Sequence, residues 1–316
     1  MLTCPAAQAS SENKAGKRKE VEGSAARPPS FLNGTIGIDT VKLTAGPNQK
    51  PYVIHKSLLC YYSPYFAAAL NGSFKEAEEN ALKIDGGFRL EVVNLFFNWL
   101  YTQTIPETRS PEIRAILNRG IESKDFDVEW DMLMTGLYIF GDRYNVPKLR
   151  KDVMDKFYSK YELGDGTGLP YGVPSYGTVL KAFNGLPDNS KLCHFFVCIY
   201  GTKWDSGCDG ASAEEIKARD EVPRIFLSKV MLKMGDVRKY NSQFDDEPPM
   251  PGLCAFHEHG PEATNACRKA QRVETAVSTA AERARMEAER AVAVETRRET
   301  MIKQAREKRL KTSNGS

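Results

Sequence analysis

The sequence PYVIHKSLLCYYSPYFAAAL, residues 51–70, couples a short β-strand pattern to an amphipathic helix. Tyr52-Val-Ile is rich in β-prone residues, and apolar residues then recur at helical spacing. Pro64 lies inside the helical part, so we expect the helix to break or restart there. The aromatic and leucine side chains are of the kind that pack a core, and they do not form the pattern of a catalytic site. The stretch therefore indicates a binding module rather than an enzyme.

Residues on both sides of this stretch predict a small sheet. Asp39-Thr-Val-Lys-Leu-Thr alternates between apolar and polar residues, and Gly46-Pro47-Asn48 is a turn signal. We therefore expect a β-hairpin that joins this strand to Tyr52-Val-Ile. Asn71-Gly72 should end the helix. Ala81-Leu-Lys-Ile-Asp then predicts a third short strand.

Helical patterns dominate the rest of the chain up to residue 234. They cover residues 90–101, 112–120, 131–140, 179–183, 192–200 and 222–234, and a further helix with Val153, Phe157 and Tyr158 follows a turn at residues 145–149. Pro223 suits the first turn of the last helix. The run from Gly164 to Gly177 is rich in Gly and Pro, so we expect a connector there. The chain therefore predicts an α+β fold followed by a second, helical block.

A set of short motifs runs through the first half of the chain. They are Asp39, His55-Lys56-Ser57-Leu58-Leu59, Ser63-Pro64-Tyr65-Phe66, Phe74-Lys75-Glu76-Ala77, Phe96-x-x-Trp99-Leu100-Tyr101-Thr102 and Leu137-x-x-Phe140-x-x-x-Tyr144-x-Val146-Pro147-x-Leu149. In this order they resemble the BTB/POZ domain, over about residues 37 to 160. The part that follows is similar to the helical C-terminal extension of many fungal BTB proteins. The resemblance implies an α+β fold of short strands flanked by helices.

We expect five parts along the chain. They are a disordered N-terminal tail (1–36), a BTB/POZ-like domain (37–160), a helical C-terminal extension (161–240), a linker with a Cys/His cluster (241–267) and a charged helical tail (268–316). The first part is rich in Ala, Ser, Lys, Glu and Pro and lacks periodic apolar residues, which is typical of disorder.

The resemblance implies a non-enzymatic protein-interaction module or adaptor that assembles with itself or with a partner. Some members of the family are adaptors of cullin-type ubiquitin ligases, and others are transcriptional regulators. Dimerising members often have a hydrophobic helix ahead of the first strand, and residues 1–34 supply none. Asp39 and Lys56 align with family positions that can form a charged groove. The alternative for these two residues is an ordinary surface pair of small energy.

Charge is distributed unevenly along the chain. Residues 268–311 carry 13 Lys and Arg and seven Asp and Glu, whereas the whole chain has a net charge of only +3. The tail is therefore basic and the rest mildly acidic. Residues 266–311 contain no Pro or Gly, so they predict one long helix, solvated on its own or forming a coiled coil. A nuclear regulator whose tail contacts nucleic acid is an alternative, but interspersed Glu and missing aromatics favour a solvated or partner-binding helix.

Seven scattered cysteines do not form the pattern of a disulfide framework. The first residues lack an apolar signal-peptide core, and no segment is apolar enough to predict a membrane span. We therefore expect the nucleus or the cytoplasm, with protein partners and no membrane. The run Lys17-Arg18-Lys19 is either a nuclear import signal or part of a solvated basic tail.

One cluster has the residue types of a metal site. Cys254-x-x-His257-x-His259 is followed eight residues later by Cys267. Two thiolates and two imidazoles would complete a tetrahedral zinc shell. The spacing is not a common one among zinc fingers, so a reduced, metal-free loop is the alternative. If zinc binds, it would fasten the linker to the base of the charged tail.

Other reactive residue types have simpler explanations. Cys193-His194 and Cys198 lie on an apolar helical pattern, so we expect them to pack in the core. Gly164-Asp-Gly-Thr-Gly168 lacks the Lys-Ser/Thr pair of a phosphate-binding loop, so a flexible connector is the better interpretation. No set of nucleophile, base and orienting group is evident. The sequence therefore predicts no enzyme.

Overall fold

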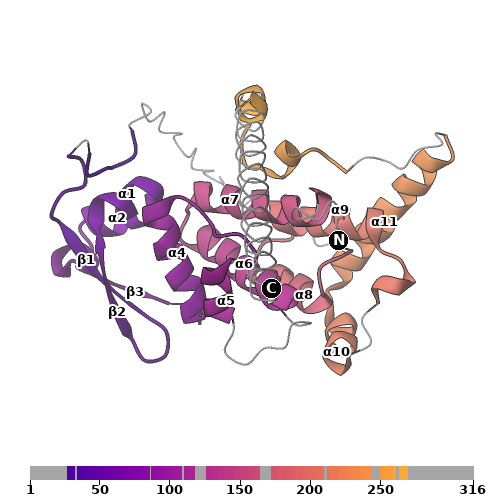
Figure 1. Ribbon diagram of the computed structural model, residues 1–316, viewed down its shortest axis with the longest axis horizontal. Helices are drawn as coiled ribbons and strands as arrows, with labels where there is room; N and C mark the ends of the chain where they lie inside the picture. Colours follow the sequence, from indigo (N-terminus) through magenta and orange to yellow (C-terminus); the bar gives the residue numbers. More distant parts are fainter. Residues whose placement is uncertain are drawn as a thin grey trace, which may run out of the picture.

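The computed structural model describes residues 27–32, 34–85, 87–108, 110–117, 126–163, 172–209, 212–243, 250–260 and 263–269. Within these ranges the chain forms an α+β fold (Figure 1), with a small sheet at one end and helices over the rest. The predicted disorder of residues 1–26, the basic run Lys17–Lys19, the Gly164–Gly168 connector and residues 270–316 of the charged tail lie outside the described residues.

The sheet has three strands in the order β2-β1-β3. Their bounds are β1 (Thr40–Ala45), β2 (Lys50–His55) and β3 (Ala81–Ile84). β1 and β2 form the predicted antiparallel hairpin, in which Val41 pairs with Ile54 and Lys42 with Val53. β3 joins the other side of β1 in parallel. Because strand residues alternate between faces, Val41 and Ile54 point into the core while Lys42 and Val53 point outward.

Apart from α3, which is not predicted, the helices of the first half follow the predicted order. They are α1 (Lys56–Tyr62), α2 (Pro64–Asn71), α3 (Lys75–Glu79), α4 (Leu90–Thr102), α5 (Pro111–Leu117), α6 (Phe126–Arg143) and α7 (Pro147–Tyr158). The break expected at Pro64 is present, because Ser63 ends α1 and its hydroxyl caps α2 by accepting the Phe66 amide. Gly72 ends α2, as its sequence predicts.

A second helical block continues from α7 without a separate core. Its elements are a short π-helix (Ser159–Leu163), α8 (Tyr176–Gly185), α9 (Lys191–Lys203), a short 3₁₀ turn (Ser206–Cys208), α10 (Ala213–Glu221), α11 (Arg224–Asn241) and the 3₁₀ turn η3 (Leu253–Phe256). Residues 263–269 are also helical. Pro223 differs slightly from its predicted place, since it precedes α11 as the N-cap residue.

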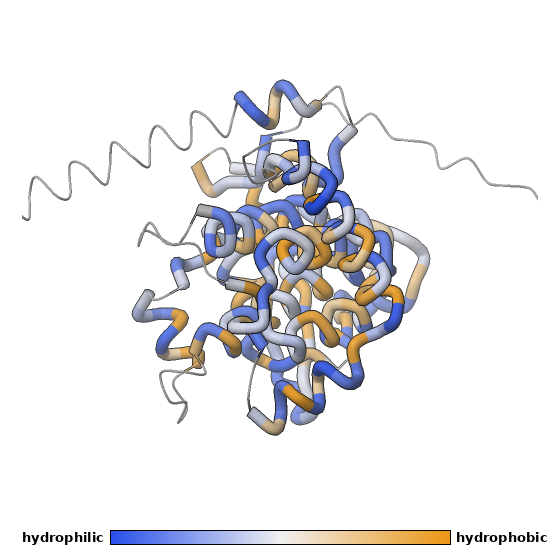
Figure 2. Tube along the Cα trace, turned by 90° about the vertical axis from the view of Figure 1, so that its right-hand side faces the viewer, coloured by the Kyte–Doolittle hydropathy of each residue, from blue (hydrophilic) through white to orange (hydrophobic). Residues whose placement is uncertain are grey.

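One hydrophobic core joins the sheet to the helical block. It runs from Val41 in β1 to Phe256 in η3. α6 lies at its centre and contacts α4, α7 and α8, which explains why its apolar residues surround the helix rather than form one stripe. Figure 2 shows the hydrophobic residues gathered in the interior and the hydrophilic ones on the outside. Among the described helices, none has the length and apolar character that crossing a bilayer demands.

Candidate metal centre and interaction surface

The linker segment 250–260 packs onto α7 and α9 through one aromatic anchor. Phe256 is buried, and its ring lies 5.1 Å from that of Phe195 and 6.2 Å from that of Tyr158, centroid to centroid. Nζ of Lys191 donates a hydrogen bond of 2.9 Å to the carbonyl oxygen of Ala255. These contacts fix the segment that carries three of the four predicted metal ligands.

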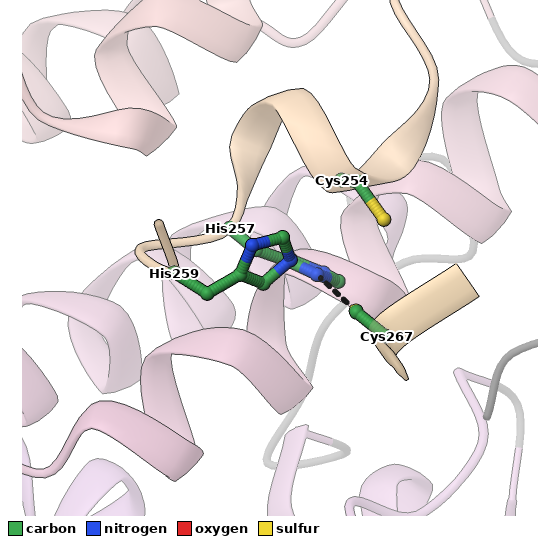
Figure 3. A group of neighbouring side chains, drawn as sticks. All are labelled: Cys254, His257, His259 and Cys267. Atoms are coloured by element: carbon green, nitrogen blue, oxygen red, sulfur yellow. Dashed lines mark hydrogen bonds between the residues drawn. The ribbon is translucent and has the colours of Figure 1, made fainter. Parts of the chain in front are cut away.

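The structure brings all four predicted ligands together. One potential ligand atom from each of Cys254, His257, His259 and Cys267 lies within 4.8 Å of the other three. Figure 3 shows the side chains converging, with Cys254 on η3, the two histidines on the segment that follows it and Cys267 on the helical residues 263–269. The cluster therefore joins two pieces of chain that are separated by residues 261–262.

His257 is buried, and contacts to both of its ring nitrogens fix the orientation of the ring. Its Nδ1 lies 3.2 Å from Sγ of Cys267, and its Nε2 lies 2.6 Å from Oδ1 of Asp155 on α7. Nζ of Lys151 lies 2.6 Å from the other oxygen of Asp155. Burial opposes ionisation of Asp155, but its hydrogen bonds with His257 and Lys151 outweigh burial and lower its pKa below the usual value. Asp155 is therefore the carboxylate that accepts the proton on Nε2.

His259 has a different environment. Its Nδ1 lies 3.3 Å from the carbonyl oxygen of Gly260, to which it can donate. Its Nε2 is buried and has no hydrogen-bond partner among the described residues. The pKa of Cys267 is raised, first by burial and then by the neighbouring Cys254 thiol. The cluster thus contains an unpaired imidazole nitrogen next to two thiols.

Glu258, between the two histidines in sequence, forms an ion pair with the buried Arg150 that the sequence alone does not reveal. Glu258 receives hydrogen bonds from Arg150 of α7, with Nε 2.8 Å from Oε1, and from the hydroxyl of Tyr138 of α6 at 3.2 Å. Arg150 also donates to the carbonyl oxygen of Gly141 at 2.8 Å. The segment is therefore held on α6 and α7 by charge as well as by Phe256.

The second pair of predicted site residues, Asp39 and Lys56, lies beside the small sheet. The backbone amide of Lys56 donates a hydrogen bond of 3.0 Å to the carbonyl oxygen of Asp39. Asp39 is exposed and Lys56 is partly exposed, so this backbone contact lies at the edge of the sheet with both side chains accessible to solvent. The structure thus places them together on the surface.

An aromatic group adjoins this pair. The ring of His55 in β2 lies 5.5 Å from that of Phe31 and 5.8 Å from that of Tyr101. Its Nδ1 is 2.9 Å from the hydroxyl oxygen of Tyr101. Val53 points outward from the same strand and is 67% exposed. We call Phe31, Asp39, Val53, His55, Lys56 and Tyr101 the hairpin surface.

The cysteines on α9 pack in the core, as their helical pattern predicts. Cys193 and Cys198 are both buried, and burial raises the pKa of each thiol. The six cysteines that the structure describes form no disulfide bond. These residues therefore contribute packing to the fold.

Comparison with protein families agrees with the arrangement of strands and helices. The family model of the BTB/POZ domain matches residues 38–122, which span the sheet, α1 to α5 and the hairpin surface from Asp39 onward. A search of curated proteins gave no match. The sheet order, the helices around it and the family match together identify residues 38–122 as a BTB/POZ domain.

Proposed function

We propose that this protein is a non-enzymatic adaptor that binds another protein, or a second copy of itself, through the hairpin surface of its BTB/POZ domain. BTB/POZ domains are protein–protein interaction modules. The observation that carries the proposal is the exposure of Val53 beside the aromatic group formed by Phe31, His55 and Tyr101. Apolar and aromatic side chains that gather on a surface mark interaction sites.

The charges beside this group support binding of a partner with defined orientation. Asp39 and Lys56 have opposite signs and are held together by their backbone hydrogen bond. Opposite charges at the rim of an interface mainly determine the rate of association and the choice of partner, and contribute little to affinity. We therefore assign affinity to Val53 and the aromatic residues, and selectivity to Asp39 and Lys56.

Affinity purification from the native host tests the proposal with two matched variants of the full chain. Val53→Asp places a charge on the hairpin surface. Met231→Asp places the same charge on α11, at a position with the same exposure of 67%. Because neither side chain is in the core, both variants should fold, and circular dichroism checks this. Light scattering after size-exclusion chromatography measures self-association.

We expect Val53→Asp to weaken binding of a partner, or self-association, by at least about tenfold, whereas Met231→Asp leaves it unchanged. Partner loss in Met231→Asp alone would overturn the proposal and assign binding to α11. Recovery of a cullin with the wild type would define the adaptor as part of a ubiquitin ligase. Salt-sensitive recovery of DNA that Val53→Asp does not affect would instead favour a nuclear regulator.

A further inference from the structure

We propose that Cys254, His257, His259 and Cys267 bind one zinc ion, and that this ion fastens the start of the charged tail to α7. The inference is independent of the adaptor role, since none of these residues belongs to the hairpin surface. It rests on three features of the cluster: the distances between its donor atoms, the orientation of His257 and the unpaired nitrogen of His259.

The distances fit tetrahedral coordination with little movement. Zinc binds thiolates at about 2.3 Å and imidazoles at about 2.0–2.1 Å, which places ligand atoms roughly 3.3–3.8 Å apart in a tetrahedron. The four atoms lie within 4.8 Å of one another. A pair at the upper limit of 4.8 Å would therefore close by about 1.0–1.5 Å on binding. Two thiolates with two imidazoles form one of the usual zinc sets, and softer ligands favour zinc over magnesium or calcium.

The orientation of His257 is that of a metal-bound histidine. Ligating histidines usually donate their second ring N–H to a carboxylate, which fixes the tautomer and the ring. Here Asp155 accepts at Nε2 at 2.6 Å, and this leaves the lone pair of Nδ1 facing the cluster and Sγ of Cys267. Lys151 in turn holds Asp155. The support for the ligand thus continues into α7.

His259 distinguishes a zinc site from a metal-free loop. A loop held only by hydrogen bonds explains His257, whose two nitrogens both have partners. It does not explain His259, whose buried Nε2 has none among the described residues. A buried nitrogen without a partner costs free energy that a bond to a metal would recover. We therefore assign Nε2 of His259 as a zinc ligand.

Zinc at this point would link three pieces of chain. Three ligands come from residues 254–259, the fourth comes from the helical residues 263–269, and the supporting carboxylate comes from α7. The described part of the chain ends at residue 269, two residues after Cys267. The ion would therefore hold the helical residues 263–269, where the predicted charged tail begins, against α7.

Native mass spectrometry of the full chain tests the site, with cobalt absorption as a second readout. We expect one zinc ion per chain and, after exchange with Co²⁺, the visible absorption of tetrahedral cobalt with thiolate ligands. Cys254→Ser and His259→Gln should each lower zinc affinity by at least about tenfold, and Asp155→Asn by about 10- to 100-fold. Cys208→Ser is the matched control, because Cys208 is also partly exposed but lies outside the cluster.

Hydrogen exchange provides a readout that does not depend on any variant. Removing zinc from the wild type with a chelator should increase exchange in residues 250–260 and 263–269 and leave α4 unchanged. Wild-type protein without zinc, even after addition of zinc salt, would overturn the proposal. So would equal zinc affinity in the wild type and His259→Gln. If Cys254→Ser does not fold, the milder His259→Gln and the chelator experiment still decide.

Discussion

The guanidinium group of Arg150 on α7 forms a bidentate pair with the carboxylate of Glu258 in the linker, across 108 residues of sequence. Arg150 is buried, and its pKa is raised because the hydrogen bonds and charge of Glu258 outweigh the opposing effect of burial. Bidentate pairs of this kind define direction as well as distance. The pair therefore orients the loop on which His257 and His259 lie.

Glu258→Gln should loosen this loop. The change leaves the buried guanidinium group without its counter-charge and should cost about 1–3 kcal/mol of local stability. Glu258 is 37% exposed, which places the expected cost in the lower part of that range. Hydrogen exchange in residues 250–260 measures it. Glu107→Gln is the control, since Glu107 pairs with Lys156 but is 79% exposed. If Glu258→Gln and Glu107→Gln changed hydrogen exchange in residues 250–260 equally, the ion pair with Arg150 would not be what holds the loop.

Ser63→Ala should destabilise the first half of the fold by about 1–2 kcal/mol. The Ser63 hydroxyl accepts the Phe66 amide at 3.0 Å and donates to the carbonyl oxygen of Tyr144 at 2.6 Å. It thus caps α2 and ties that helix to the end of α6. Ser190→Ala is the matched control, because Ser190 caps α9 through Cys193. Urea unfolding should show the larger loss for Ser63→Ala, and the reverse order would refute the role of the Tyr144 bond.

The sequence predicts those parts of the fold that are encoded locally. The hairpin follows from alternation and a turn signal, and α4 follows from its apolar stripe. α3 and α10 are not predicted, because KEAEE and AEEIKARDE carry charge without an apolar stripe. The sequence also does not predict that β3 pairs in parallel with β1, because no turn signal connects two strands that lie so far apart in the chain.

The candidate metal centre also contains residues that the sequence predicts and one supporting residue that it does not. Cys254, His257, His259 and Cys267 stand out by residue type and proximity in sequence. Asp155 does not, because on α7 it forms an ordinary i,i+4 pair with Lys151 and lies 102 residues before His257. Such charges usually belong to a solvated helix face. Only the packing of the linker on α7 shows that Asp155 supports the cluster.

Lys160→Met should destabilise the protein by about 3–5 kcal/mol. Nζ of Lys160 lies 2.8 Å from Oδ1 of Asp131, and the two side chains are only 1% and 4% exposed. Removing the lysine leaves a buried carboxylate whose remaining partners include the hydroxyl of Tyr161. Adding Asp131→Asn should restore part of the loss, because the uncompensated charge is then gone. A double-mutant cycle in urea measures this, and additive losses would exclude a coupled pair.

Lys181 should make the free energy of unfolding depend on pH, and comparison of the wild type with a Lys181 variant measures this dependence. It reaches from α8 to the carbonyl oxygen of Met132 on α6 at 2.6 Å. Burial, assisted by the charge of Arg89 and opposed by Glu129, lowers its pKa from 10.5 to about 8. Between these values the unfolded chain binds more protons than the folded one, so the folded state gains stability as pH rises.

Lys181→Met removes this titration and leaves the other groups in place. The free energy of unfolding of the wild type should therefore rise relative to that of the variant between pH 8 and pH 10. Below pH 8 the difference should be constant, because Lys181 is then protonated in both states. Urea unfolding of both proteins at pH 7, 8, 9 and 10 checks this. A difference that stays constant up to pH 10 would show that the ammonium group of Lys181 is solvated rather than buried between α6 and α8.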